Sequence, residues 1–203
     1  EFARTAKGIP VVNLLSLEKQ ETIKSIISVD EYTAGHYLFF VTEKGVVKRT
    51  EIKEFESIRQ NGKIAISLRE GDMLLDVKQT TGALFVSLAS STGKMVTFLE
   101  SNVRDMGRTA AGVRGMKLAE GAKVIGVSTS SEGKYILVVT NKGFGKLTAF
   151  EEYRQTKRGA KGVNTIKASD KNGNLIALKS ANGDEDLLVV TKAGVIIRIS
   201  LTQ

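Results

Sequence analysis

The sequence predicts an all-β fold made of repeats about 50 residues long. The first observation is a segment that occurs four times: an apolar, β-branched run, a short polar turn with a glycine, and a second such run. Two such runs around a glycine are typical of a β-hairpin, because glycine adopts the positive φ that tight turns require. The turn glycines are Gly45, Gly93, Gly143 and Gly194, which lie 48, 50 and 51 residues apart.

A second segment recurs with the same period and supplies the remaining strands. Its aligned glycines are Gly8, Gly62, Gly112 and Gly162, at spacings of 54, 50 and 50 residues. We expect a strand after each of them, then a polar turn (69–72, 119–122 and 170–173) and one more strand. Four short strands per repeat are typical of a propeller-type blade, and no amphipathic helix of convincing length interrupts the pattern.

These two segments also predict how the chain is divided. Complete four-stranded blades are expected over 37–83, 84–134 and 135–185, with partial blades over 1–36 and 186–203. The chain is therefore interpreted as a fragment of one repeat domain, a partial set of about four blades.

Composition limits the chemistry that this fold can carry. Thirty Lys and Arg residues stand against 22 Asp and Glu residues, and the net charge of +8 favours polyanionic partners, either nucleic acid or an anionic membrane surface. No apolar run approaches the roughly 18–20 residues of a membrane span. The absence of cysteine excludes disulfides and thiolate sites and fits a reducing cytosol, and a single histidine, His36, removes the usual general base.

Alignment of the repeats accounts for three of the four tyrosines, and the fourth, Tyr32, has no basic or metal-binding neighbourhood. Tyr37 and Tyr135 each precede a turn glycine by eight residues, so both are predicted strand positions. Tyr153 occupies the position of Phe55 and Val103 in the other repeats, which favours a buried anchor over a nucleophile. The carboxylates at 184–186 and at 70 and 72 fall in predicted turns, where we expect them to be solvated. We therefore expect no catalytic site, no metal and no cofactor in this chain.

The basic residues gather in the second recurring segment, with few acids among them. Because a repeat places equivalent loops on one rim, the predicted result is a positive stripe. Lys and Arg donors beside glycine N–H groups suit phosphate, and scarce aromatics argue against stacking on single strands, so the predicted partner is double-stranded DNA. The candidate DNA-binding residues are Arg4, Lys7, Arg59, Lys63, Arg104, Arg108, Arg114, Lys117, Arg154, Lys157, Arg158, Lys161 and Lys167, with the loop glycines Gly8, Gly62, Gly112, Gly159 and Gly162.

Several motifs resemble one family. GVVKRT, GFGKLT, RTAAGVRGMKL and above all EEYRQTKRGAKGV are similar to the C-terminal domain of the DNA gyrase A protein. The resemblance implies a β-pinwheel, a propeller in which blades exchange strands, that wraps duplex DNA around a basic rim. It also implies that this region catalyses nothing, whereas its parent, a cytoplasmic bacterial type II topoisomerase, is an A2B2 heterotetramer with the gyrase B protein that negatively supercoils DNA. ATP and Mg²⁺ would belong to other parts of that enzyme.

One motif departs from the family. The gyrase box, QRRGGKG, has its nearest match at 155–162, with one extra residue and Ala160 where glycine is expected. In the family this box belongs to the first blade, so by order along the chain the match is interpreted as a later blade's degenerate copy, with the true box expected upstream of Glu1. Such a fragment is expected to bind DNA but to wrap it poorly. Two alternatives remain: the C-terminal domain of the topoisomerase IV A protein, which often has fewer blades and degenerate boxes, and a propeller-type scaffold for protein interactions.

Overall fold

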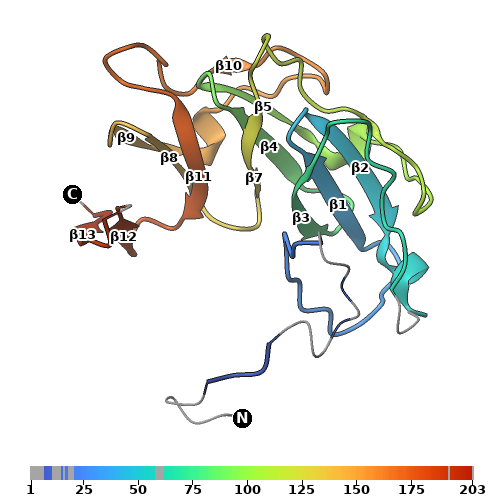
Figure 1. Ribbon diagram of the computed structural model, residues 1–203. Helices are drawn as coiled ribbons and strands as arrows, with labels where there is room; N and C mark the ends of the chain where they lie inside the picture. The colour runs from blue at the N-terminus through green and yellow to red at the C-terminus, as the bar shows by residue number, and fades with distance from the viewer. Residues whose placement is uncertain are drawn as a thin grey trace.

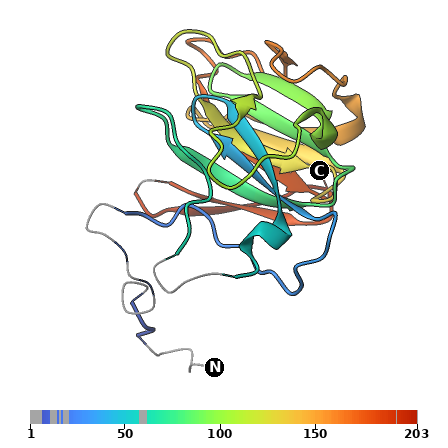
Figure 2. The ribbon, with the colours of Figure 1, turned by 90° about the vertical axis from the view of Figure 1, so that its right-hand side faces the viewer.

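The computed structural model describes residues 7–10, 15, 17, 21–57, 62–191 and 193–202. These residues form an all-β fold, as predicted, whose sheets follow one another around an arc (Figure 1) and stack face to face when the view is turned by 90° (Figure 2). The strands are β1 (Tyr37–Thr42), β2 (Val46–Glu51), β3 (Leu74–Thr80), β4 (Phe85–Ser90), β5 (Lys94–Leu99), β6 (Val113–Arg114), β7 (Val124–Thr129), β8 (Tyr135–Thr140), β9 (Gly145–Ala149), β10 (Val163–Asn164), β11 (Leu175–Ala181), β12 (Asp186–Val190) and β13 (Ile196–Ser200).

The four predicted hairpins are confirmed. Strands β1–β2, β4–β5, β8–β9 and β12–β13 pair antiparallel, and the glycine in each turn has a φ between 75° and 82°. After each of the first three hairpins comes a single 3-10 turn, over Ile52–Phe55, Glu100–Asn102 and Phe150–Glu152. Each of these turns redirects the chain into the next basic loop.

Two of the sheets take their outer strand from the following repeat. Sheet I has the order β3-β1-β2-β6 and sheet II the order β7-β4-β5-β10. Val47 of β2 pairs with Val113 of β6, and Met95 of β5 pairs with Val163 of β10. The blades therefore exchange strands, as the resemblance implied, while the blade ranges, which describe sequence repeats, stay a prediction.

This exchange depends on glycine at two positions. A Cβ on Gly112 would lie 2.5 Å from the carbonyl oxygen of Val47, and one on Gly162 would lie 2.4 Å from that of Met95. Both glycines also have positive φ, 89° and 82°. No other residue combines that backbone conformation with such a close approach.

The strand expected after Gly62 is absent, since residues 62–69 form none. By analogy with β6 and β10, its partner would be the second strand of a hairpin one repeat earlier. The described part of 7–36 contains no hairpin. Of the segment expected after Gly8, residues 11–14 lie outside the described residues.

The core lies between the stacked sheets. Sheet III (β11-β8-β9) follows sheet II, and β7 contacts both β3 and β11 along the inner side of the arc. Phe39 and Val47 of sheet I pack with Leu88 and Phe98 of sheet II, while the opposite face of sheet II packs through Met95 against sheet III. Strands β4 and β5 are therefore buried on both faces, which explains why each strand has apolar residues on both faces.

The polar turn at 69–72 differs from expectation. Asp72 is buried rather than solvated. Its carboxylate accepts hydrogen bonds from the Thr42 hydroxyl at 2.7 Å and from the Lys44 and Met73 N–H groups at 2.9 and 2.8 Å. A buried carboxylate requires such donors, so Asp72 secures the β1–β2 turn against β3.

Candidate nucleic-acid interface

Three basic loops, 62–69, 104–117 and 154–167, form the candidate interface. Loop 104–117 runs along β2 of the preceding repeat: the Met106 N–H donates to the Arg49 carbonyl and the Gly115 N–H to the Gly45 carbonyl, at 2.9 and 2.8 Å. Loop 154–167 runs along β5 in the same way, through the N–H groups of Thr156 and Thr165. Each of these two loops is thus held on the hairpin of the repeat before it.

The second and third loops follow the same course 50 residues apart, except that Gly159 has a φ of 80° and Thr109, at the same repeat position, does not have a positive φ. In each, a turn is closed by an alanine N–H, from Ala110 to the Gly107 carbonyl and from Ala160 to the Lys157 carbonyl. The described residues include no non-glycine residue with positive φ, so Ala160 occupies its place in the degenerate box without strain. Gly159 and Gly162, by contrast, both have positive φ.

Neighbouring loops are hydrogen-bonded to each other, so they form one continuous edge. Ser67 joins the first loop to the second. Its N–H donates to the Ala110 carbonyl at 3.4 Å, and its hydroxyl donates to the Thr109 carbonyl at 2.6 Å. The Gly159 N–H donates to the Gly115 carbonyl at 2.7 Å, which joins the third loop to the second. The structure therefore brings the predicted loops together on one rim.

The rim keeps its positive charge. Among the candidates, Lys7, Arg104, Arg114, Lys117, Arg154, Lys157, Lys161 and Lys167 are exposed, whereas Lys63, Arg108 and Arg158 are half-buried. Within the described part of the chain, none of these cations forms a salt bridge. Arg4 and Arg59 lie outside the described residues.

The one acid inside loop 104–117 is already paired. Asp105 contacts the Arg49 guanidinium at 2.5 Å, and the same guanidinium lies 3.9 Å from Glu100, which is fully buried. Arg49 also stacks on the Tyr37 ring, 4.3 Å from its centroid. Because Asp105 faces the buried Arg49, it anchors the loop and leaves the loop cations uncompensated.

A cleft between the loops collects three arginines from three repeats. Arg69, Arg114 and Arg158 line it together with the backbone of Gly112 and Gly159. The Arg158 guanidinium donates to the Arg114 carbonyl at 2.8 Å and that of Arg69 to the Gly112 carbonyl at 3.4 Å. Arg69 was absent from the predicted binding residues, although its place at the end of the first loop could have indicated it.

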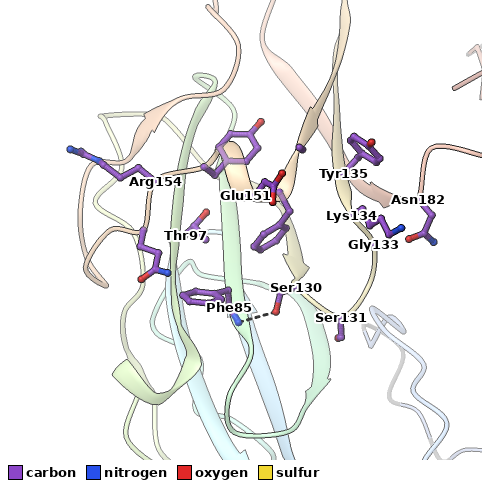
Figure 3. Close-up of a pocket in the computed structure, with 14 residues that line it drawn as sticks. Phe85, Thr97, Ser130, Ser131, Gly133, Lys134, Tyr135, Glu151, Arg154 and Asn182 are labelled. Carbon is purple, nitrogen blue, oxygen red and sulfur yellow. Dashed lines mark hydrogen bonds between the residues drawn. The ribbon is translucent and has the colours of Figure 1, made fainter. Parts of the chain in front are cut away.

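Another cavity lies away from this cleft. It has a volume of about 930 Å³ and lies between sheets II and III, lined by Phe85, Tyr135 and Tyr153 among others (Figure 3). Figure 3 shows the Phe85 N–H bonded to the Ser130 hydroxyl, at 3.1 Å. Only Arg154 and Gln155 of the basic loops reach this cavity, so it is not where the charge gathers.

The residues considered for catalysis make contacts within the fold. Tyr153 is buried, as predicted, and its hydroxyl is 2.5 Å from that of Thr165. Tyr37 and Tyr135 each begin a strand, as expected. Asp186 pairs with Arg198 across the β12–β13 hairpin. In the described ranges no group of three or more acidic or histidine residues is arranged to hold a metal ion, and no helix is long and apolar enough to span a membrane.

The repeats match a known family. The model of the DNA gyrase C-terminal domain, a β-propeller, matches residues 36–81, 85–131, 134–182 and 185–203. The chain belongs to this family. Each of the four matched segments begins within one residue of the first strand of a hairpin, which is β1, β4, β8 or β12.

Curated relatives agree with this assignment. The DNA gyrase A protein of Ureaplasma parvum serovar 3 is 49% identical over 199 residues, and that of Staphylococcus epidermidis is 43% identical over 204 residues. These matches cover 98% and 99% of this chain. The chain spans only 24% and 23% of those relatives' own length.

Solved structures show the same fold. The C-terminal domain of a DNA topoisomerase IV superposes with a TM-score of 0.87 at 28% identity, covering 96% of this chain and 61% of that one. A DNA gyrase A C-terminal domain superposes with a TM-score of 0.82 at 29% identity, covering 95% and 65%. Both likenesses support the β-pinwheel expected from the sequence.

Proposed function

We propose that this chain binds duplex DNA through its basic rim and catalyses nothing itself. The observation that carries the proposal is the continuous edge of hydrogen-bonded loops. The cations of these loops form no salt bridge with any acid among the described residues. Phosphate recognition requires donors and charge, and the loops supply both through Lys, Arg and glycine N–H groups. Such contacts fix a protein on the duplex without reading its sequence.

The curvature of the arc favours a bent duplex. Smooth bending of 20–30 base pairs by 40–90° costs about 1–6 kcal/mol, so several loops must act together. In the proposed parent enzyme, an A2B2 type II topoisomerase of the bacterial cytoplasm, the domain would hold DNA while ATP and Mg²⁺ act elsewhere. We propose that no cofactor binds in this chain.

A test of the rim uses two exposed lysines, Lys157 and Lys161. Replacing both by alanine should weaken duplex binding and reduce the slope of log affinity against log salt by roughly 1.8, at about 0.9 for each lost phosphate contact. The matched control replaces Lys53 and Lys179, which are exposed but lie off the three loops. Affinity is measured by fluorescence anisotropy of a labelled duplex at several salt concentrations. Equal slopes for both double variants would favour a protein-interaction scaffold.

The degenerate box bears on wrapping. We propose that the chain retards linear duplex on a gel but does not change the linking number of nicked circles sealed by ligase. A second candidate function is that of a topoisomerase IV A C-terminal domain, which would hold DNA without wrapping it fully. The likeness to a solved structure of such a domain favours this candidate. A clear linking-number change produced by the chain alone would refute both statements.

A further inference from the structure

A buried lysine lies beneath the junction of two basic loops. Lys48 of β2 has no solvent exposure. Its ammonium donates to the carbonyl of Ala65 at 2.5 Å and to the carbonyl of Arg108, and it lies 5.2 Å from the centroid of the Phe40 ring. Ala65 belongs to loop 62–69 and Arg108 to loop 104–117, so one side chain joins two loops.

The next junction is built differently. There the Gly159 N–H donates directly to the carbonyl of Gly115, which occupies the repeat position of Ala65. The position of Lys48, opposite Phe40 in the hairpin, is taken by Val96, opposite Leu88, and Val96 is fully buried in the core. A lysine is therefore not needed to fill this position, and its presence at the first junction calls for another reason.

Burial changes how this lysine holds its proton. Burial first, and then the nearby Arg108 charge, lower the pKa of Lys48 to about 8. Arg108 is the charged group that faces it from the 104–117 loop, whereas β1 presents the Phe40 ring and loop 62–69 the Ala65 carbonyl. Among the described residues no acid pairs with it. The charged form thus depends on the two loop carbonyls remaining in place.

We propose that Lys48 is a positioning residue for DNA binding, which holds the 62–69 and 104–117 loops together and takes up a proton when duplex phosphates occupy them. This inference rests on the proposed function. Phosphates on the loops offset the Arg108 charge and favour the ammonium. By linkage, affinity then falls as pH rises above 8, by at most about tenfold per pH unit for one proton.

The experiment measures duplex affinity from pH 7 to pH 9.5 at constant ionic strength. The wild-type chain should lose affinity over this range, whereas Lys48→Met should bind more weakly at pH 7 and show a flat profile. Lys48→Arg keeps the charge at every pH, so it should bind well without the pH dependence. The control is Lys146→Met: Lys146 holds the equivalent place in the β8–β9 hairpin but is exposed, and its profile should match the wild type.

A second readout needs no DNA. Amide hydrogen exchange of Ser67, which donates to the Ala110 carbonyl in the neighbouring loop, should be faster in Lys48→Met than in Lys146→Met. Identical pH profiles for wild type and both Lys48 variants, or unchanged exchange at Ser67, would overturn the inference. Failure of the wild-type chain to bind duplex at pH 7 would instead overturn the proposed function, while the exchange result still judges the loop junction. Should Lys48→Met not fold, the flat profile of Lys48→Arg decides.

Discussion

The close approach of Gly162 to β5 gives a prediction whose size follows from the geometry. In Gly162→Ala, the new Cβ would lie 2.4 Å from the Met95 carbonyl oxygen at a φ of +82°. The left-handed conformation costs an L-residue about 1–2 kcal/mol. The clash also moves β10 away from β5 and breaks its pairing and the Thr165 N–H bond, at about 1 kcal/mol for each hydrogen bond. The free energy of unfolding should fall by about 3–4 kcal/mol.

The matched control is Gly62→Ala. Gly62 has a φ of +74°, but no atom of the described residues lies within 4 Å of the position that an added Cβ would take, so this variant carries the conformational cost alone, about 1–2 kcal/mol. Urea denaturation followed by circular dichroism compares the two variants, and amide exchange of Thr165 reports on the β10 junction itself. Because loop 154–167 is anchored there, duplex affinity should also fall more in Gly162→Ala. Equal losses of stability would show that the close approach has no energetic consequence and would refute the reasoning.

Three further predictions concern buried polar groups. Tyr153→Phe leaves the Thr165 hydroxyl unpaired and should lower the free energy of unfolding by about 1 kcal/mol, measured by denaturation; an unchanged midpoint would contradict this. Glu100→Gln replaces a buried carboxylate that accepts hydrogen bonds from the Thr80 hydroxyl and the Leu84 N–H, and should cost about 2 kcal/mol by the same assay; an unchanged free energy of unfolding would contradict this. The unfolded chain binds more protons than the folded one between the Lys48 pKa of about 8 and its ordinary 10.5, so the free energy of unfolding should rise with pH over this window; in denaturation series, Lys48→Met should flatten that rise.

The features predicted correctly are those with local causes. The turn glycines mark the hairpins because positive φ is a property of one residue, and all four hairpins form at the expected places. Repetition made the prediction firmer, since one period of about 50 residues recurs through the chain. The burial of Tyr153 followed from its alignment with Phe55 and Val103, both of which are buried.

The features missed depend on contacts between distant residues. Asp72 was expected in solvent, but it is buried, and the hydroxyl of Thr42, 30 residues earlier, donates a hydrogen bond to its carboxylate. Lys48 looks like an ordinary strand lysine, and nothing local separates it from the exposed Lys146. Its burial is decided by two loops that arrive 17 and 60 residues later. Sequence periodicity indicates that such loops exist, whereas their contacts depend on the path of the whole chain.

Strand exchange has a mechanical consequence. Because β6 belongs to one repeat and pairs with β2 of the repeat before it, a pull on loop 104–117 is borne by the preceding hairpin. Strand β10 is joined to β5 in the same way, so if duplex DNA binds to loops 104–117 and 154–167 as proposed, tension in the DNA would be distributed over successive sheets. A substitution that disrupts one exchanged strand would therefore also weaken the contact between its loop and the preceding repeat, because adjacent repeats carry the force in series.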